Sequence, residues 1–172
     1  LEINVPRGAR LEIETLAASI VIEGVDGDVR VETSAGDVTY SGAARRIEAD
    51  SASGDIEVNT TAEGADIDVE GLAGDALVQF VVADVSITTV TGAARAIGGR
   101  LIAGDFESVS GILYFEGVIG AGAEIRLENF NGDIQLLLPL DTSASFDISA
   151  YSSSIETEFG YQGRAVEPYS PQ

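Results

Sequence analysis

The chain has 172 residues and a net charge of −20, and so acidic a surface repels nucleic acid and anionic lipid, which excludes both as expected partners. It contains no Cys and no His, which excludes disulfides, zinc–thiolate sites, histidine-ligated metals and catalysis by either side chain. No stretch approaches 18 consecutive apolar residues, so we expect no transmembrane segment. An export signal is not visible in this chain, and we expect any such signal to lie outside it.

A short phrase recurs along the chain. Residues 33–38 read Thr-Ser-Ala-Gly-Asp-Val and residues 51–56 read Ser-Ala-Ser-Gly-Asp-Ile. In chain order, the glycine position of successive copies is occupied by Ala18, Gly36, Gly54, Gly74, Gly92, Gly111, Gly132 and Ser153. The steps are 18 to 21 residues long. A fixed period of this length predicts a repeat architecture.

The residues around each glycine alternate between apolar and polar. Val29 and Val31 precede Gly36, and Val38 and Tyr40 follow it, each pair separated by one polar residue. Alternation at period two predicts half-buried strands, so each repeat holds two short strands joined at a glycine corner. Stacking the repeats in register would bury the apolar rows in one continuous core. We therefore predict an all-β, single-domain parallel β-helix (β-solenoid) of about eight coils of 18–21 residues.

The boundaries follow from where this pattern stops. Residues 1–160 carry the repeat, and residues 161–172, which include two prolines, are expected to form an irregular tail or a truncated last coil. The rival fold is an antiparallel β-sandwich, which matches the strand spacing but gives no reason to keep one residue type at the same phase of every cycle. The two open ends of a solenoid carry unpaired backbone groups, which makes them candidate contacts for a homo-oligomer.

Two acidic columns are candidate sites. The first follows the corner glycines and consists of Asp37, Asp55, Asp75 and Asp133. Stacked carboxylates suit Ca²⁺, but the glycine-rich nonapeptides of a calcium β-roll are absent. We therefore expect hydrogen-bonded turn residues there, with no bound metal and no cofactor.

The second column lies four residues before each glycine position and faces outward. Its acidic members are Glu14, Glu32, Asp50, Glu70, Glu107 and Glu128. Neighbouring carboxylates repel one another, so bound cations or arginines such as Arg30 and Arg126 should compensate them. One interpretation is a stripe that keeps the protein soluble; the other is a face that binds cations or a basic ligand.

Residues 127–134 read Leu-Glu-Asn-Phe-Asn-Gly-Asp-Ile, and Leu136-Leu137-Leu138-Pro139 follows soon after. This passage, with the recurring Ser-Gly-Asp phrase, resembles a bacterial adhesin family of tandem β-solenoid repeats, over residues 1–160. The resemblance implies a right-handed parallel β-helix in the cell envelope, at the cell surface or outside the cell. The chain departs from the family pattern at Ala93 and Ile112, which replace Asp, and at Ser153-Ser154, which replace Gly-Asp.

These observations favour a non-enzymatic adhesin-like or scaffold module whose partner is a protein or glycan of the cell surface. One alternative is a carbohydrate-active β-helix that binds or cleaves polysaccharide with paired carboxylates, although Tyr114 is the only outward aromatic side chain that stands out. The other alternative is a component of envelope-stress signalling.

Overall fold

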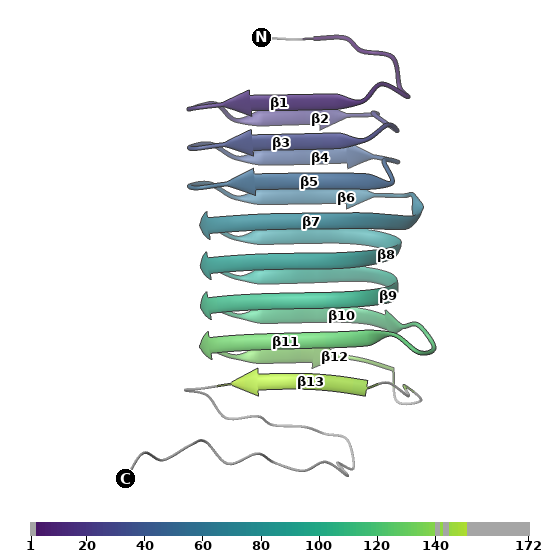
Figure 1. Ribbon diagram of the computed structural model, residues 1–172, viewed down its shortest axis with the longest axis vertical. Coiled ribbons are helices and arrows are strands. Elements are labelled where there is room, and N and C mark those ends of the chain that lie inside the picture. The colour runs from purple at the N-terminus through teal and green to yellow at the C-terminus, as the bar shows by residue number, and fades with distance from the viewer. Residues whose placement is uncertain (1–2, 140–141, 143–144, 151–172) are drawn as a thin grey trace.

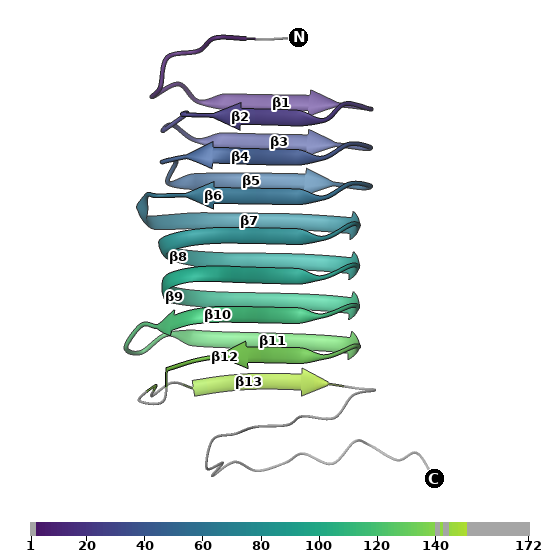
Figure 2. The same cartoon turned by 180° about the vertical axis from the view of Figure 1, so that it is seen from behind.

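A computed structural model describes residues 3–139, 142 and 145–150. Its strands wind into a parallel β-solenoid of about seven turns (Figures 1 and 2). The strands are β1 (Leu11–Thr15), β2 (Ile20–Glu23), β3 (Val29–Thr33), β4 (Val38–Gly42), β5 (Arg46–Ser51), β6 (Ile56–Thr60), β7 (Glu63–Ala73), β8 (Ala76–Thr91), β9 (Ala94–Ser110), β10 (Leu113–Ile119), β11 (Glu124–Asn131), β12 (Ile134–Leu137) and β13 (Ser145–Ala150). The described part of the chain contains no helix, and hence none that could cross a membrane.

The solenoid has two walls. The first wall stacks β1, β3, β5, β7, the second halves of β8 and β9, β11 and β13. The second wall stacks β2, β4, β6, the first halves of β8 and β9, β10 and β12 (Figure 2). Every pairing is parallel and joins residues one coil apart, such as Val38 with Ile56. The predicted solenoid is confirmed, and the sandwich is not the fold.

The sequence pattern predicts about eight coils, and the structure describes about seven turns. The eighth coil contributes β13 to the first wall. Its predicted second strand, around Ile155 and Thr157, lies outside the described residues. The predicted boundary at residue 160 and the predicted tail lie outside them as well.

One narrow edge of the solenoid, the glycine edge, joins the first wall to the second. It contains the repeated glycines Gly36, Gly54, Gly74, Gly92, Gly111 and Gly132, all with positive φ. A Cβ atom built on Gly74 would lie 2.1 Å from the carbonyl oxygen of Gly54. The other five glycines place such an atom 1.8 to 2.3 Å from the carbonyl oxygen of the equivalent residue in the preceding coil. The positive φ and the lack of room for a Cβ atom therefore both require glycine, which explains why glycine recurs at this position of each coil.

The opposite edge, the return edge, brings the chain back to the next coil through residues 24–28, 42–46, 60–66, 80–84, 98–103 and 117–124. The register of strand pairing shifts at or next to these segments. The shifts lie between Glu63 and Ala65 in β7, between Ala83 and Asp84 in β8, and between Glu116 and Val118 in β10. The extra residues of the longer coils lie here as well. The strands on both walls consequently keep their register although the coils differ in length.

The core between the walls is built from aliphatic side chains and a few aromatic ones. Tyr40 is buried, and its hydroxyl donates to the Val25 carbonyl (2.7 Å) and accepts from the Ala44 amide (2.8 Å). Burial raises the pKa of this hydroxyl. Phe106 and Phe115 face each other across the interior with ring centroids 6.1 Å apart. Beside the glycine edge, the inward slot is narrow and holds the small or polar buried residues Thr33, Ser51, Thr89, Ser108 and Asn129.

Candidate binding surfaces

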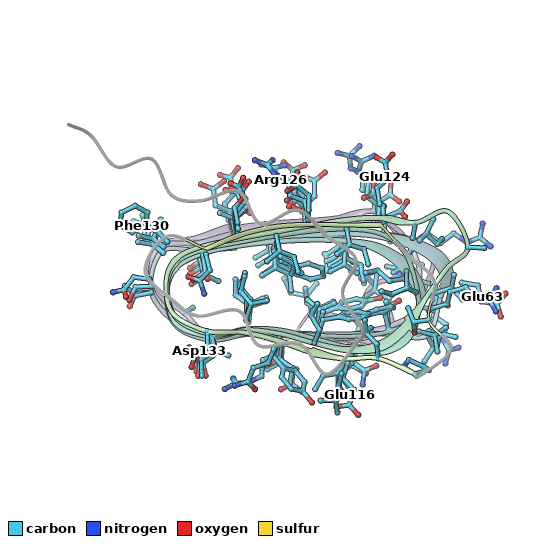
Figure 3. The ribbon with its side chains drawn as sticks, turned by 90° about the horizontal axis from the view of Figure 1, so that it is seen from below. Glu63, Glu116, Glu124, Arg126, Phe130 and Asp133 are labelled. Carbon is cyan, nitrogen blue, oxygen red and sulfur yellow. The ribbon has the colours of Figure 1, made fainter. Side chains whose placement is uncertain are left out.

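The first wall carries its charged side chains in parallel columns that point away from the core (Figure 3). The predicted acidic stripe is one of these columns. Strand pairing places Glu14, Glu32, Asp50, Glu70, Thr88, Glu107 and Glu128 in register, one per coil. The Cα atoms of neighbouring stripe residues therefore lie about 5 Å apart, and their carboxylates point to the same side of the wall. Burial, and then the charge of Glu70, raises the pKa of Asp50.

Arginines on the neighbouring columns neutralise part of this wall. Arg126 lies 2.8 Å from the Glu128 carboxylate and 3.4 Å from that of Glu107, so its predicted compensation of the stripe is confirmed. Arg30 forms its ion pair with Glu48, one coil on in its own column, and it also interacts electrostatically with Glu32 and Asp50 of the stripe. Glu48 also accepts a hydrogen bond from Arg46 at 3.1 Å. The hydrogen bonds from both arginines lower the pKa of Glu48.

The corner aspartates form a hydrogen-bonded ladder along the second wall. One carboxylate oxygen of Asp37 accepts from the Asp55 amide (3.0 Å), Asp55 accepts from the Asp75 amide (2.8 Å), and Asp75 accepts from the Ala93 amide (2.9 Å). Asp75 also pairs with Arg95 at 3.0 Å, and the amide bond and this arginine lower the pKa of Asp75. We expected turn residues that bond locally; the bonds instead run to the next coil.

That this ladder binds no metal remains a prediction. Within residues 3–139, 142 and 145–150, no group of three or more Asp or Glu side chains is arranged to hold a metal ion. The fourth candidate, Asp133, lies on the same corner column, since the Leu113 amide donates to its carbonyl oxygen at 2.9 Å.

Two shallow grooves mark the first wall. One lies beside the Arg30–Glu48 pair, between Asp28 and Arg46. The other lies over Ala103, whose short side chain leaves a notch between the carboxylates of Asp84 and Glu124. The floor of this notch includes Asp105, one of whose carboxylate oxygens is buried without a hydrogen-bond partner. Both grooves are open to solvent along the wall. The first combines three arginines with two acids, whereas the second is lined mainly by carboxylates, which suits cationic groups.

The second wall is less charged. Its outward column reads Val21, Thr39, Glu57, Leu77, Arg95, Tyr114 and Gln135 from coil to coil. The Tyr114 hydroxyl donates to a Glu116 carboxylate oxygen at 2.7 Å, which raises the pKa of that hydroxyl. Asn59 and Gln79 form a side-chain hydrogen bond of 3.4 Å between coils.

Sequence reasoning missed one surface, an apolar row on the glycine edge. Leu72, Val90, Val109 and Phe130 are all exposed and occupy the position two residues before the glycine in successive coils. Figure 3 shows Phe130 at this narrow edge, on the far side of the solenoid from Glu63. The signal was present in the repeat itself, because this slot is apolar in these copies although it points away from the core.

Comparison with known proteins gives one result. A family model described as Toastrack DUF4097 matches residues 2–168. The searches of curated proteins and of solved structures returned no match.

Proposed function

The chain belongs to the Toastrack DUF4097 family, and we propose that it acts as a non-enzymatic scaffold or adhesin-like module of the cell envelope or the extracellular space. Its partner in this proposal is a protein or glycan of the cell surface. The name of the family states no activity, so the support comes from the surfaces of the solenoid.

The in-register acidic stripe is the observation that carries the proposal. Its carboxylates fan outward from a flat wall, one per coil except at Thr88, and Arg126 is shared among three of the surrounding acids, at 2.8 to 3.9 Å. A flat repeating surface of this kind suits contact with a large or extended partner, because a small ligand is usually enclosed on most of its surface. Repeat solenoids commonly use such extended faces for binding.

Immunolabelling of intact and of lysed producing cells tests the location. The proposal expects labelling of intact cells or recovery of the protein from the medium. Labelling that needs lysis of the cytoplasmic membrane would contradict an envelope or extracellular role.

Adhesion of beads coated with the purified chain to the same cells tests the binding role. The variant E14Q/E32Q/D50N/E70Q/E107Q/E128Q removes the charge of the stripe, and E23Q/E57Q/E116Q removes three carboxylates from the second wall as the control. We expect the stripe variant to lose most of the adhesion and the control to keep it. Equal adhesion of both variants would refute a role for the stripe.

Incubation with a panel of polysaccharides tests the non-enzymatic part of the proposal. We expect no new reducing ends or unsaturated products over those released by buffer alone. Release that the stripe variant abolishes would contradict the proposal and favour a carbohydrate-active solenoid.

A further inference from the structure

The apolar row on the glycine edge is a continuous surface over four coils. Gly71, Thr89, Ser108 and Asn129 are paired in register on one side of it, and Ala73, Thr91, Ser110 and Asn131 on the other. Leu72, Val90, Val109 and Phe130 therefore stack one per coil, and Leu72, Val90 and Val109 are 58%, 37% and 50% exposed. Ile112 widens the row on the second-wall side and is also exposed. We call these five residues the corner ridge.

The ridge is absent from the first three coils. The equivalent slots there hold Leu16, Ser34 and Ala52, of which only Leu16 is large and apolar. Acids flank the slot on both sides in the second and third coils, as Glu32 and Asp37 do beside Ser34. The same flanking recurs at the two ends of the ridge, beside Leu72 and Phe130. A run of exposed apolar side chains on one part of an otherwise charged solenoid is the usual mark of an interaction surface.

Three breaks in the repeat coincide at the centre of the ridge. Thr88 interrupts the acidic stripe, and Ala93 and Ile112 interrupt the aspartate ladder. Each break removes a carboxylate that would otherwise stand beside Val90 or Val109. Because a carboxylate buried under a partner loses its hydration, these three replacements lower the cost of covering the ridge.

Acidic side chains remain along both margins of the ridge. Glu70, Glu107 and Glu128 line the first-wall side, and Asp75 and Asp133 line the second-wall side. The surface is thus an apolar row with negative charge along both margins. A partner with positive charge on both sides of an apolar row is its complement. A second copy of this chain, with its net charge of −20, is disfavoured by repulsion between the same margins.

The spacing of the ridge selects a helix over a strand. Its side chains repeat at the coil spacing of about 4.8 Å. The apolar side chains of an amphipathic helix repeat every turn, about 5.4 Å, and stay close to this spacing over three turns. Side chains on one face of an extended strand repeat at about 6.6 Å and fall out of step after two coils. We propose that the corner ridge docks an amphipathic helix of a partner protein, with Lys or Arg flanking its apolar row on both sides.

This inference rests on the proposed function, since it names the kind of partner that the module binds. The probe is a synthetic, fluorescein-labelled helical peptide of 18 residues with a Leu row flanked by Lys on both sides. Fluorescence anisotropy against the purified full chain measures its Kd. A second peptide, with Gln in place of the Leu row, keeps the charge and removes the apolar contact. We expect it to bind at least about tenfold more weakly, because several buried leucines are lost.

Variants of the chain place the contact on the ridge. V90S/V109S is expected to weaken binding of the Leu–Lys peptide about tenfold, whereas I102S, which removes an exposed isoleucine at the return edge, should change the Kd less than about twofold. Circular dichroism confirms that each variant is folded. Equal weakening by both variants, or no binding of the peptide by the unmodified chain, would overturn the inference.

One further variant separates ridge docking from simple charge attraction. I112S shortens an exposed apolar side chain of the ridge and leaves the charge of the chain unchanged. Ridge docking predicts weaker binding of the Leu–Lys peptide, whereas charge attraction alone predicts no change in its Kd. An unchanged Kd would overturn the inference, and so would a dimer in sedimentation velocity that V90S/V109S dissociates. Because these readouts use purified components, their failure leaves the cell-adhesion test of the proposed function unaffected.

Discussion

Both edges of the solenoid carry the chain from one wall to the other, but they do so with different kinds of segment. The glycine edge turns the chain within a fixed number of residues, and each repeated glycine lies against a carbonyl oxygen of the coil before it. The return edge uses segments of different length and accommodates the register shifts of the sheet. The glycine edge therefore sets the register of the stack, while the return edge accommodates the variation in coil length.

The largest expected effect comes from filling the space at the glycine edge. Gly74→Ala would place a Cβ atom 2.1 Å from the Gly54 carbonyl oxygen at φ 132°. We expect it to lower the free energy of unfolding by about 3–5 kcal/mol, from backbone strain and overpacking together. Gly64→Ala is the matched control at the return edge, where φ is also positive but no atom lies within 4 Å of the new Cβ. Its expected cost is about 1 kcal/mol.

Denaturant unfolding followed by circular dichroism measures both variants. A cost for Gly74→Ala no larger than that for Gly64→Ala would show that close approach at the glycine edge does not limit the stack.

The aspartate ladder gives a smaller effect. Asp75→Ala removes the acceptor of the Ala93 amide and the partner of Arg95, and we expect a loss of about 1–2 kcal/mol at pH 7. Because the pKa of Asp75 is lowered in the folded protein, its contribution is present above the unfolded pKa and disappears as the pH falls through the folded pKa. The difference between this variant and the unmodified chain should therefore vanish in acid.

The control for this prediction is Asp68→Ala, which removes an outward aspartate from the first wall. Thermal unfolding at pH 7 and in acid measures both changes. An Asp75→Ala effect that persists unchanged in acid would contradict the assignment of the carboxylate as the acceptor.

The inward polar slot beside the glycine edge predicts effects of opposite sign at two equivalent threonines. Thr33 is buried and its hydroxyl donates to the Ala35 carbonyl oxygen at 3.3 Å. The Thr89 hydroxyl is buried without a hydrogen-bond partner. Thr89→Val should raise the free energy of unfolding by about 1 kcal/mol, and Thr33→Val should lower it by about 0.5–1 kcal/mol. Thermal unfolding of the two variants measures the difference, and destabilisation by Thr89→Val would show that its hydroxyl is satisfied in solution.

The smallest expected effect is at the acidic stripe. The pKa of Asp50 is raised by burial and by Glu70, so the ionised side chain opposes folding at neutral pH and ceases to do so as the pH falls below the unfolded pKa. Asp50→Asn should therefore stabilise the fold at pH 7 by about 0.5 kcal/mol and have no effect near pH 3. Thermal unfolding at both pH values tests this, and destabilisation at pH 7 would contradict the crowding of the stripe.

The architecture could be predicted from the sequence because the same residue types recur at the same positions of each coil, and a stacked solenoid explains this recurrence. Gly54 and Gly74 mark the corner, and Val38 and Ile56 mark the inward slots of the same wall. The acidic stripe could also be predicted, because its residues lie four positions before each glycine position in the sequence.

Features that depend on contacts between coils could not be predicted. The bond from Asp55 to the Asp75 amide exists only once two coils are stacked, and a turn residue that bonds locally has the same sequence. Tyr40 looked like any inward apolar residue, yet its hydroxyl fixes the return edge through Val25 and Ala44. The corner ridge was not predicted because the apolar positions of the repeat were assigned to the core, whereas the slot two residues before each glycine is also apolar in the four coils of the ridge and points outward.

The claim that the glycine edge sets the register, while the return edge tolerates changes in length, is tested most directly by inserting the same Gly-Ser dipeptide at each edge. One variant carries it after Gly122 in the return edge, and the other after Gly92 at the glycine edge, and thermal unfolding by circular dichroism is measured for both. The structure predicts that the first variant melts within a few degrees of the unmodified chain and that the second loses cooperative unfolding, because its stack would have to change register. Equal tolerance of the two insertions would contradict the claim that the glycine edge sets the register.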